Sequence, residues 1–246
     1  MSNVILVIIM VLADILGLGP GADIDARIED ALKAELGKKV QAVQVETHIN
    51  KGSLLTKGKI AAIDFTLEGL WVKPVRIEEA YFNVEDIRIN ASKVLLGKSD
   101  SCLRSIGDIS FRFTFLPQDL ARALELRSEN IREPEIALAG GQLVISGKYL
   151  LGPISTPFEV EGYLSYEGGS RIYYRINAVR VAGLGLPATF RKMIEDELNP
   201  LFDLGEFHEK RREEFERNEK MVGRSLKVEV KHIVVGDDRI VITGSV

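Results

Sequence analysis

The sequence predicts an α+β fold in which a long, strongly curved antiparallel β-sheet wraps around amphipathic helices. Much of the chain alternates apolar and polar residues with a period of two, which is typical of antiparallel strands that have one covered face. Between two blocks of such strands, residues 186–198 carry apolar side chains at helical steps, and Pro187 suits the first turn of a helix. Pro200 ends this helix, although the residues after it remain mostly apolar. We therefore expect the strands to enclose the helix.

Composition narrows the class of protein. The chain has 246 residues, of which 46% are hydrophobic, and this suffices for the core of one large domain or of two small ones. The net charge of −4 gives no global electrostatic reason to bind nucleic acid. The single cysteine, Cys102, excludes an intrachain disulfide and a cysteine-based zinc site. His48, His208 and His232 lack the spacing of metal ligands, so we expect neither a metal nor another cofactor.

The first 22 residues have features of an export segment. Residues 4–13 form a continuous apolar run that is shorter than the ~20 residues of a spanning helix but suits the core of a signal peptide. Against this interpretation, Lys and Arg are missing before the run, and Asp14 lies near its end. We expect residues 1–22 to be a signal peptide or an N-terminal membrane anchor. The alternative is a buried strand or helix of the mature domain, which would otherwise comprise residues 23–246.

The first half of this domain begins with a helix and continues as strands. Apolar residues from Ile24 to Leu36 recur at helical steps, and Gly37 occupies the usual position after a helix. From residue 40 the period changes to two. Residues 51–58 are predicted to be a turn-rich link. The strands expected in this half are at residues 40–49, 59–70, 72–77 and 80–90.

The second half repeats strands and helices and ends in a hairpin. Residues 109–115 predict a strand with phenylalanines on one face, and residues 117–127 predict a helix that begins at a proline. Gly236, Asp237 and Asp238 are a good hairpin signal. The other strands expected here are at residues 135–139, 142–150, 154–166, 171–181, 225–235 and 239–246.

A strongly charged segment interrupts this half. Residues 206–220 contain acids and bases that nearly cancel, at spacings that suit pairs on a helix. We expect a solvated helix, within a charged helical insertion at residues 205–223. The more specific alternative is that this helix is a lid or contacts a membrane.

The sequence lacks the common catalytic motifs. It contains no GxSxG elbow, no HExxH and no P-loop, and its histidines belong to no motif with a serine or with Cys102. We therefore expect a protein that is not an enzyme and has no catalytic residues. Alternating strands and amphipathic helices can enclose an interior that is filled by side chains or left open as an apolar cavity. The pattern alone does not distinguish these two outcomes.

Four short segments, in this order along the chain, resemble the LmeA family of bacterial phospholipid-binding proteins. They are residues 52–63 (GSLLTKGKIAAI), 116–120 (LPQDL), 186–204 with its Leu198-Asn199-Pro200, and 237–244 (DDRIVITG). The resemblance extends from about Asp23 to the C-terminus. The chain departs from the family by the missing basic residues at its start and by the insertion at residues 205–223.

The resemblance implies an exported, non-enzymatic protein of the bacterial cell envelope, outside the cytoplasm, with a fold similar to the tubular lipid-binding superfamily. It implies binding of phospholipid or another acyl-chain lipid in an apolar cavity, contact with a membrane surface, and a role in envelope lipid transport or maintenance. The candidate wall residues, each of which could equally be core, are Phe65, Leu67, Phe82, Phe111, Phe113, Phe115, Phe158, Phe190, Ile194 and Leu198.

The alternative function is a structural or interaction module of the envelope. In that case the interior is fully packed, and the charged helix at residues 206–220 is the docking surface for a protein partner that the sequence does not identify.

Overall fold

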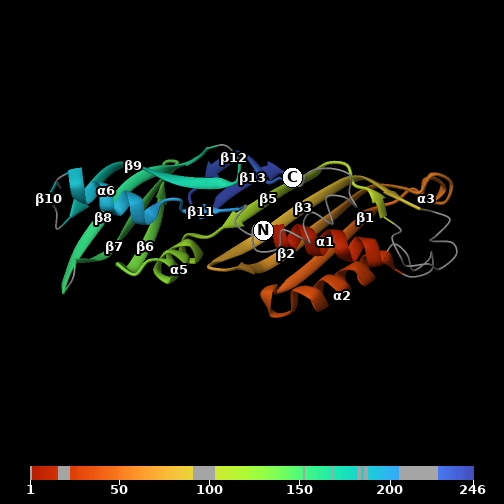
Figure 1. Ribbon diagram of the computed structural model, residues 1–246, viewed down its shortest axis with the longest axis horizontal. Helices are drawn as coiled ribbons and strands as arrows, with labels where there is room; N and C mark the ends of the chain where they lie inside the picture. The colour runs from red at the N-terminus through yellow and green to blue at the C-terminus, as the bar shows by residue number, and fades with distance from the viewer. Residues whose placement is uncertain are drawn as a thin grey trace.

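Two antiparallel sheets lie end to end along the long axis of the molecule, with helices on their faces (Figure 1). The computed structural model describes residues 2–15, 23–90, 103–151, 153–167, 169–181, 184–185, 188–204 and 227–246. One sheet is strongly curled, and the predicted α+β class with curved antiparallel strands is confirmed. The predicted strands divide between the two sheets, but the two strands expected at residues 72–77 and 80–90 are wrong, because the chain forms a single strand at Val75–Ile89 after a turn at Lys73 and Pro74.

The first sheet has seven strands in the order β1-β2-β3-β5-β13-β12, with β4 paired to β3. Its register places Phe65 opposite Phe82, and Phe82 opposite Phe111. Because side chains alternate between the two faces of a sheet, these rings share one face. The strands are β1 (Ala42–His48), β2 (Lys59–Val72), β3 (Val75–Ile89), β4 (Leu103–Ser105), β5 (Ile109–Phe115), β12 (Glu229–Val235) and β13 (Ile240–Ser245).

Helices α1 (Ser2–Ile15) and α2 (Ile24–Leu36) lie on this sheet, and the short helix η1 (Gly37–Lys39) follows α2 (Figure 1). The helix predicted from Ile24 to Leu36 is confirmed. Its N-terminus is capped by Asp23, whose carboxylate accepts a hydrogen bond from the Ala26 N–H at 3.4 Å. The buried side chains of both helices join the same hydrophobic cluster as the apolar face of the sheet.

Carboxylates of α2 cover the free edge of the first sheet. Strand β1 is an edge strand, and Glu29 and Asp25 accept hydrogen bonds from the Val45 and Thr47 N–H groups at 3.0 and 3.1 Å. Exposed edge amides are a template for unwanted strand pairing, so these bonds protect the edge as well as orient α2.

Helix α1 contains most of the apolar N-terminal run. Its buried side chains are Val4, Ile5, Ile8, Ile9, Val11 and Leu12. None of the helices in the described ranges combines the length and the hydropathy that crossing a membrane would require. The expectation that residues 1–22 are a signal peptide or an anchor stays a prediction.

The second sheet has six strands in the order β10-β9-β8-β7-β6, with β11 paired to β9. Helix α6 (Ala188–Leu198) lies along it, and α5 (Pro117–Arg127) connects the first sheet to the second (Figure 1). Both helices were expected from the sequence. The strands are β6 (Ile131–Ala139), β7 (Gln142–Leu151), β8 (Ile154–Tyr166), β9 (Arg171–Val181), β10 (Leu184–Gly185) and β11 (Phe202–Asp203).

The end of α6 is fastened to β9 by Asn199. Its amide Oδ1 accepts the Tyr174 N–H at 2.7 Å, while its Nδ2 donates to the carbonyls of Tyr174 and Glu195 at 2.9 and 3.0 Å. One side chain therefore satisfies a strand and the last turn of a helix together, which fixes the helix end against the sheet.

The prediction for residues 51–58 is wrong. Instead of a turn-rich link, the chain forms α3 (Lys51–Lys57). The Asn50 side chain caps this helix by accepting the Ser53 N–H at 3.2 Å, and Gly58 ends it in the left-handed conformation at φ 60°. Caps at both ends stabilise a helix that lacks strong apolar periodicity.

Several predictions concern residues outside the described ranges. These are the charged helix at residues 206–220, the remainder of the insertion at 205–223, Cys102 and His208.

Candidate functional site

A small, partly open cavity lies where the two sheets meet. Its volume is about 70 Å³. The walls come from the turn between β2 and β3, the buried face of α5, and residues 201–204 after α6. The turn belongs to the first sheet, α5 connects the two sheets, and residues 201–204 include β11 of the second sheet, so the cavity is a product of the junction rather than of either sheet alone.

The cavity walls are largely apolar because each contributing element turns its apolar side inward. Phe115 ends β5, and its ring lies 5.2 Å from the ring of Phe202 in β11, measured between centroids. Leu120 and Leu124 are one helical turn apart on α5 and are both buried. The junction therefore presents an alkyl and aromatic surface to whatever enters it.

Arg127 holds the two helices of the junction together. It lies at the end of α5, and its guanidinium donates to the carbonyls of Glu197, Leu198, Pro200 and Leu201 at the end of α6. The bonds to Glu197 and Leu201 measure 3.0 and 2.7 Å. A cation at a helix C-terminus is favourable because the last carbonyls carry partial negative charge.

A second hydrogen bond joins the ends of α5 and α6 beside Arg127. The buried Ser128 hydroxyl donates to the Glu197 carboxylate at 2.6 Å, and it also accepts the Ile131 N–H at 3.0 Å. These polar contacts make the end of α6 a fixed wall of the cavity.

Charged groups line the cavity beside the apolar surface. Asp203 accepts from the Ser170 hydroxyl at 2.6 Å and from Arg171 at 3.0 Å, so its oxygens are engaged. Lys73, in the turn between β2 and β3, is exposed and makes no ion pair or hydrogen bond with any residue that the structure describes. The arrangement combines an apolar hollow with an ammonium group that no described residue pairs.

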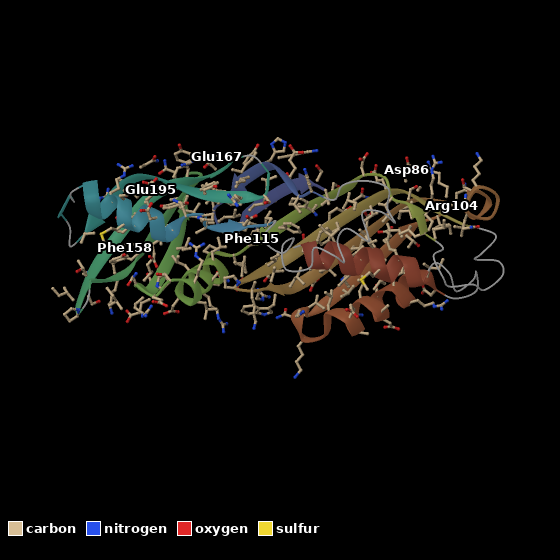
Figure 2. All side chains as sticks on the ribbon, viewed as in Figure 1. Asp86, Arg104, Phe115, Phe158, Glu167 and Glu195 are labelled. Carbon is tan, nitrogen blue, oxygen red and sulfur yellow. The ribbon has the colours of Figure 1, made fainter. Side chains whose placement is uncertain are left out.

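The candidate wall residues with a described side chain lie in one hydrophobic cluster but are divided between the parts of it at the first and at the second sheet. Phe115 lies near the middle of the molecule and Phe158 within the second sheet (Figure 2). Among the candidates with a described side chain, Phe115 alone lines the junction cavity. Phe65, Leu67, Phe82, Phe111 and Phe113 lie buried on the inner face of the first sheet, Phe158, Ile194 and Leu198 lie in the core of the second, and the Phe190 side chain is outside the description.

The phenylalanines of the first sheet form one aromatic cluster. Phe113 stacks on Phe111 at 4.5 Å and meets Phe82 edge to face at 5.4 Å, measured between ring centroids. Gly244 lies opposite Phe111 in the register, and a Cβ at this position would collide with the Phe111 ring and with the Glu229 carbonyl. The absence of a side chain at Gly244 therefore makes room for the stack.

Sequence reasoning missed most of the junction. Lys73, Leu120, Leu124 and Leu201 were not among the candidates, although they line the cavity. One signal could have indicated Leu201 and Phe202, because the chain stays apolar after Pro200 has ended the helix. Apolar residues beyond a helix must find another surface to contact.

One group of described residues has the composition of a metal site. Ligand atoms of Glu46, His48 and Asp64 lie within 4.8 Å of one another on the outer face of the first sheet. Asp64 is already engaged, because it accepts from His48 at 2.8 Å, from Tyr81 at 2.6 Å and from Asn83 at 2.7 Å. Asp64 is therefore satisfied by protein groups alone.

Titration of this network is coupled through Asp64. The hydrogen bond to Asp64 raises the pKa of His48. Burial works to raise the pKa of Asp64, but hydrogen bonds from Tyr81, Asn83 and His48 outweigh it and lower that pKa. Burial and the bond to Asp64 raise the pKa of Tyr81 to about 12. The histidine and the carboxylate stabilise each other's charged forms.

Comparison with known proteins identifies the family. Neither the curated proteins nor the solved structures include a match to this chain. The model of the LmeA-like phospholipid-binding family matches residues 21–245, which is nearly the whole chain. The chain belongs to the LmeA-like phospholipid-binding family, as the four short segments indicated.

Proposed function

We propose that the protein binds a phospholipid non-enzymatically, with part of an acyl chain in the junction cavity and the phosphate near Lys73. The family is a lipid-binding family, and the single observation that carries the finer proposal is the Lys73 ammonium beside an apolar cavity, for which the described residues offer no ion-pair partner. An acyl chain is matched by the apolar walls, and a lipid phosphate by the cation. Such a site holds the lipid at both its ends.

We place this activity in the bacterial cell envelope, outside the cytoplasm, where the protein carries or maintains membrane lipids. The apolar residues 4–13 support this location, because they have the length of a signal-peptide core. Contact with a membrane surface follows from the proposal, since the lipid has to enter from a bilayer.

The test is extraction of lipid from vesicles of phosphatidylglycerol, followed by native mass spectrometry of the protein. The unmodified protein should carry one phospholipid, and Lys73→Glu should weaken binding about tenfold by replacing attraction of the phosphate with repulsion. Lys192→Glu is the matched control, because Lys192 is exposed on α6 and does not line the cavity. It should bind as the unmodified protein does.

Two results would contradict the proposal. A protein that never carries lipid would favour the envelope interaction module, with residues 206–220 as its docking surface. Equal loss of binding in both lysine variants would show that general surface charge, rather than the cavity lining, governs association.

A further inference from the structure

The junction cavity is too small for a whole phospholipid. A cavity of roughly 150 Å³ holds one benzene molecule, whereas this one measures about 70 Å³. It accommodates the end of one alkyl chain. If the protein binds phospholipid as proposed, more apolar surface has to become available, and some element that now covers such surface has to move.

The apolar face of the first sheet extends directly from the cavity. Phe115 of β5 lines the cavity, and the same strand continues with Phe113 and Phe111 on the same face. These rings have apolar partners across the register, since Phe113 lies opposite Ala80 and Phe111 lies opposite Phe82 of β3. On β2, Leu67 lies opposite Ala80, and Phe65 lies opposite Phe82.

Helix α1 contributes to the cover over this face. Ile5, Ile8, Ile9 and Leu12 are at most 2% exposed, and they recur at three- and four-residue steps along one side of the helix. The helix has 14 residues and is therefore about 21 Å long. One acyl chain spans half of a hydrocarbon core of about 30 Å. The surface that α1 shields is thus long enough for an acyl chain.

The contacts that hold α1 can be replaced by an alkyl chain. The α1 side chains that the structure describes are all aliphatic or Met, so they contact the core through apolar atoms alone. Such contacts are non-directional, and their strength follows the area removed from water. An acyl chain in the same place restores that burial, and none of the α1 side chains within the description loses a polar partner.

Helix α1 also lies outside the part of the chain that defines the family. The family match begins at residue 21, after α1, and includes α2 and both sheets. The apolar face of β2, β3 and β5 is thus part of the shared domain, whereas the helix that covers it in this structure is not.

We propose that α1 is a displaceable plug, and that acyl chains of a bound phospholipid replace it on the inner face of β2, β3 and β5. This inference rests on the proposed phospholipid binding, which it deepens by assigning the long apolar part of the site. It also takes residues 1–22 as a retained N-terminal anchor rather than a cleaved signal peptide. The junction cavity is then the entrance for the lipid, and the acyl chains lie against the face beneath α1.

The first test uses the full chain with vesicles of phosphatidylglycerol that carries a photoreactive diazirine on its palmitoyl chain. Irradiation should label peptides of β2, β3 and β5. Hydrogen exchange of the amides at residues 4–12 should become about tenfold faster when lipid is bound, because α1 leaves the sheet. Label confined to α5 and residues 201–204, or unchanged exchange in α1, would overturn the plug and leave the junction site standing. The absence of label from every peptide would overturn the lipid binding itself.

The second test breaks the docking of α1. Leu12 is fully buried, whereas Met10 on the same helix is 42% exposed, so Leu12→Asp and Met10→Asp add the same charge on opposite sides of α1. Leu12→Asp should tighten lipid binding about tenfold, because only molecules with α1 undocked can bind lipid and the substitution increases their fraction. Met10→Asp should bind as the unmodified chain does. A folded Leu12→Asp variant with unchanged affinity would contradict the plug. If that variant does not fold, the exchange experiment on the unmodified chain decides.

Discussion

The two sheets are covered in chemically different ways. Helix α6 lies along the second sheet and is fastened by directional polar bonds, in which Asn199 bridges to β9 and Arg127 caps the helix end from α5. Helix α1 lies on the first sheet and contributes aliphatic side chains to the core. Both helices are buried on one side, so burial alone does not separate them.

The difference shows which cover can be exchanged. Removing α6 would leave backbone carbonyls and N–H groups of the junction without partners, and each buried polar group left in this way costs about 1–3 kcal/mol. Removing α1 exposes apolar area, which a lipid can cover again. Two helices that are both buried on one side are thus held differently, and the proposal assigns α6 as a fixed wall of the site and α1 as its displaceable plug.

The largest effect is expected from breaking the fastening of α6. Asn199→Ala removes three hydrogen bonds, including those to the N–H and the carbonyl of Tyr174. We expect the free energy of unfolding to fall by about 2–4 kcal/mol, because these backbone groups lose their partner in a part-buried position. Urea denaturation followed by circular dichroism measures this change.

Asn130→Ala is the matched control. The Asn130 amide lies near the same helix end, but its one described side-chain contact, with Glu197, measures 3.5 Å and is at the limit of a hydrogen bond. This variant should lose less than about 1 kcal/mol. Equal losses in the two variants would mean that Asn199 does not fasten α6 as its bonds indicate.

A smaller effect is expected from trimming α1. A buried Leu→Ala substitution usually costs about 2–5 kcal/mol. If the docked state of α1 is populated about tenfold more than the undocked state, docking contributes about 1.4 kcal/mol to the free energy of unfolding. Leu12→Ala can then lower the free energy of unfolding by no more than this amount. Urea denaturation again measures the change. A loss in the usual range would show that α1 is an integral part of the core.

Much of the architecture could be predicted because periodicity records which side of an element is buried. The helix at 23–36 and its end at Gly37 follow from one apolar stripe and one glycine, and the structure confirms both. Pro200 likewise indicated the end of α6 at Leu198. These signals are local, so a single sequence contains them.

The junction could not be predicted because its contacts join residues far apart in the chain. Arg127 caps carbonyls that lie about 70 positions later, and nothing around Arg127 identifies α6 as its partner. The N-terminal run shows the same limit, since its composition suits a signal peptide, an anchor or a buried helix equally. Periodicity says that a face is covered, but the covering element depends on the tertiary arrangement.

The smallest expected effect concerns the polar outer face of the first sheet. The hydrogen bond to Asp64 raises the pKa of His48 above its ordinary value of about 6.5. The folded state therefore binds this proton more tightly than the unfolded chain does, and the resulting stabilisation is complete below about pH 6.5. It is lost as the pH rises through the folded-state pKa of His48. Because the pair is exposed, the change should be small.

Urea denaturation at pH 6 and pH 8.5 checks this prediction, with NMR titration of the His48 ring as a direct measurement of its pKa. His48→Gln should remove part of the stability lost between these two pH values. His232→Gln, which replaces an exposed histidine of β12 in the same sheet, should retain that loss. An unchanged pH dependence in His48→Gln would mean that the bond to Asp64 contributes nothing in solution. His48 would then be a solvated side chain, and the stabilising contacts of Asp64 on this face would be those with Tyr81 and Asn83.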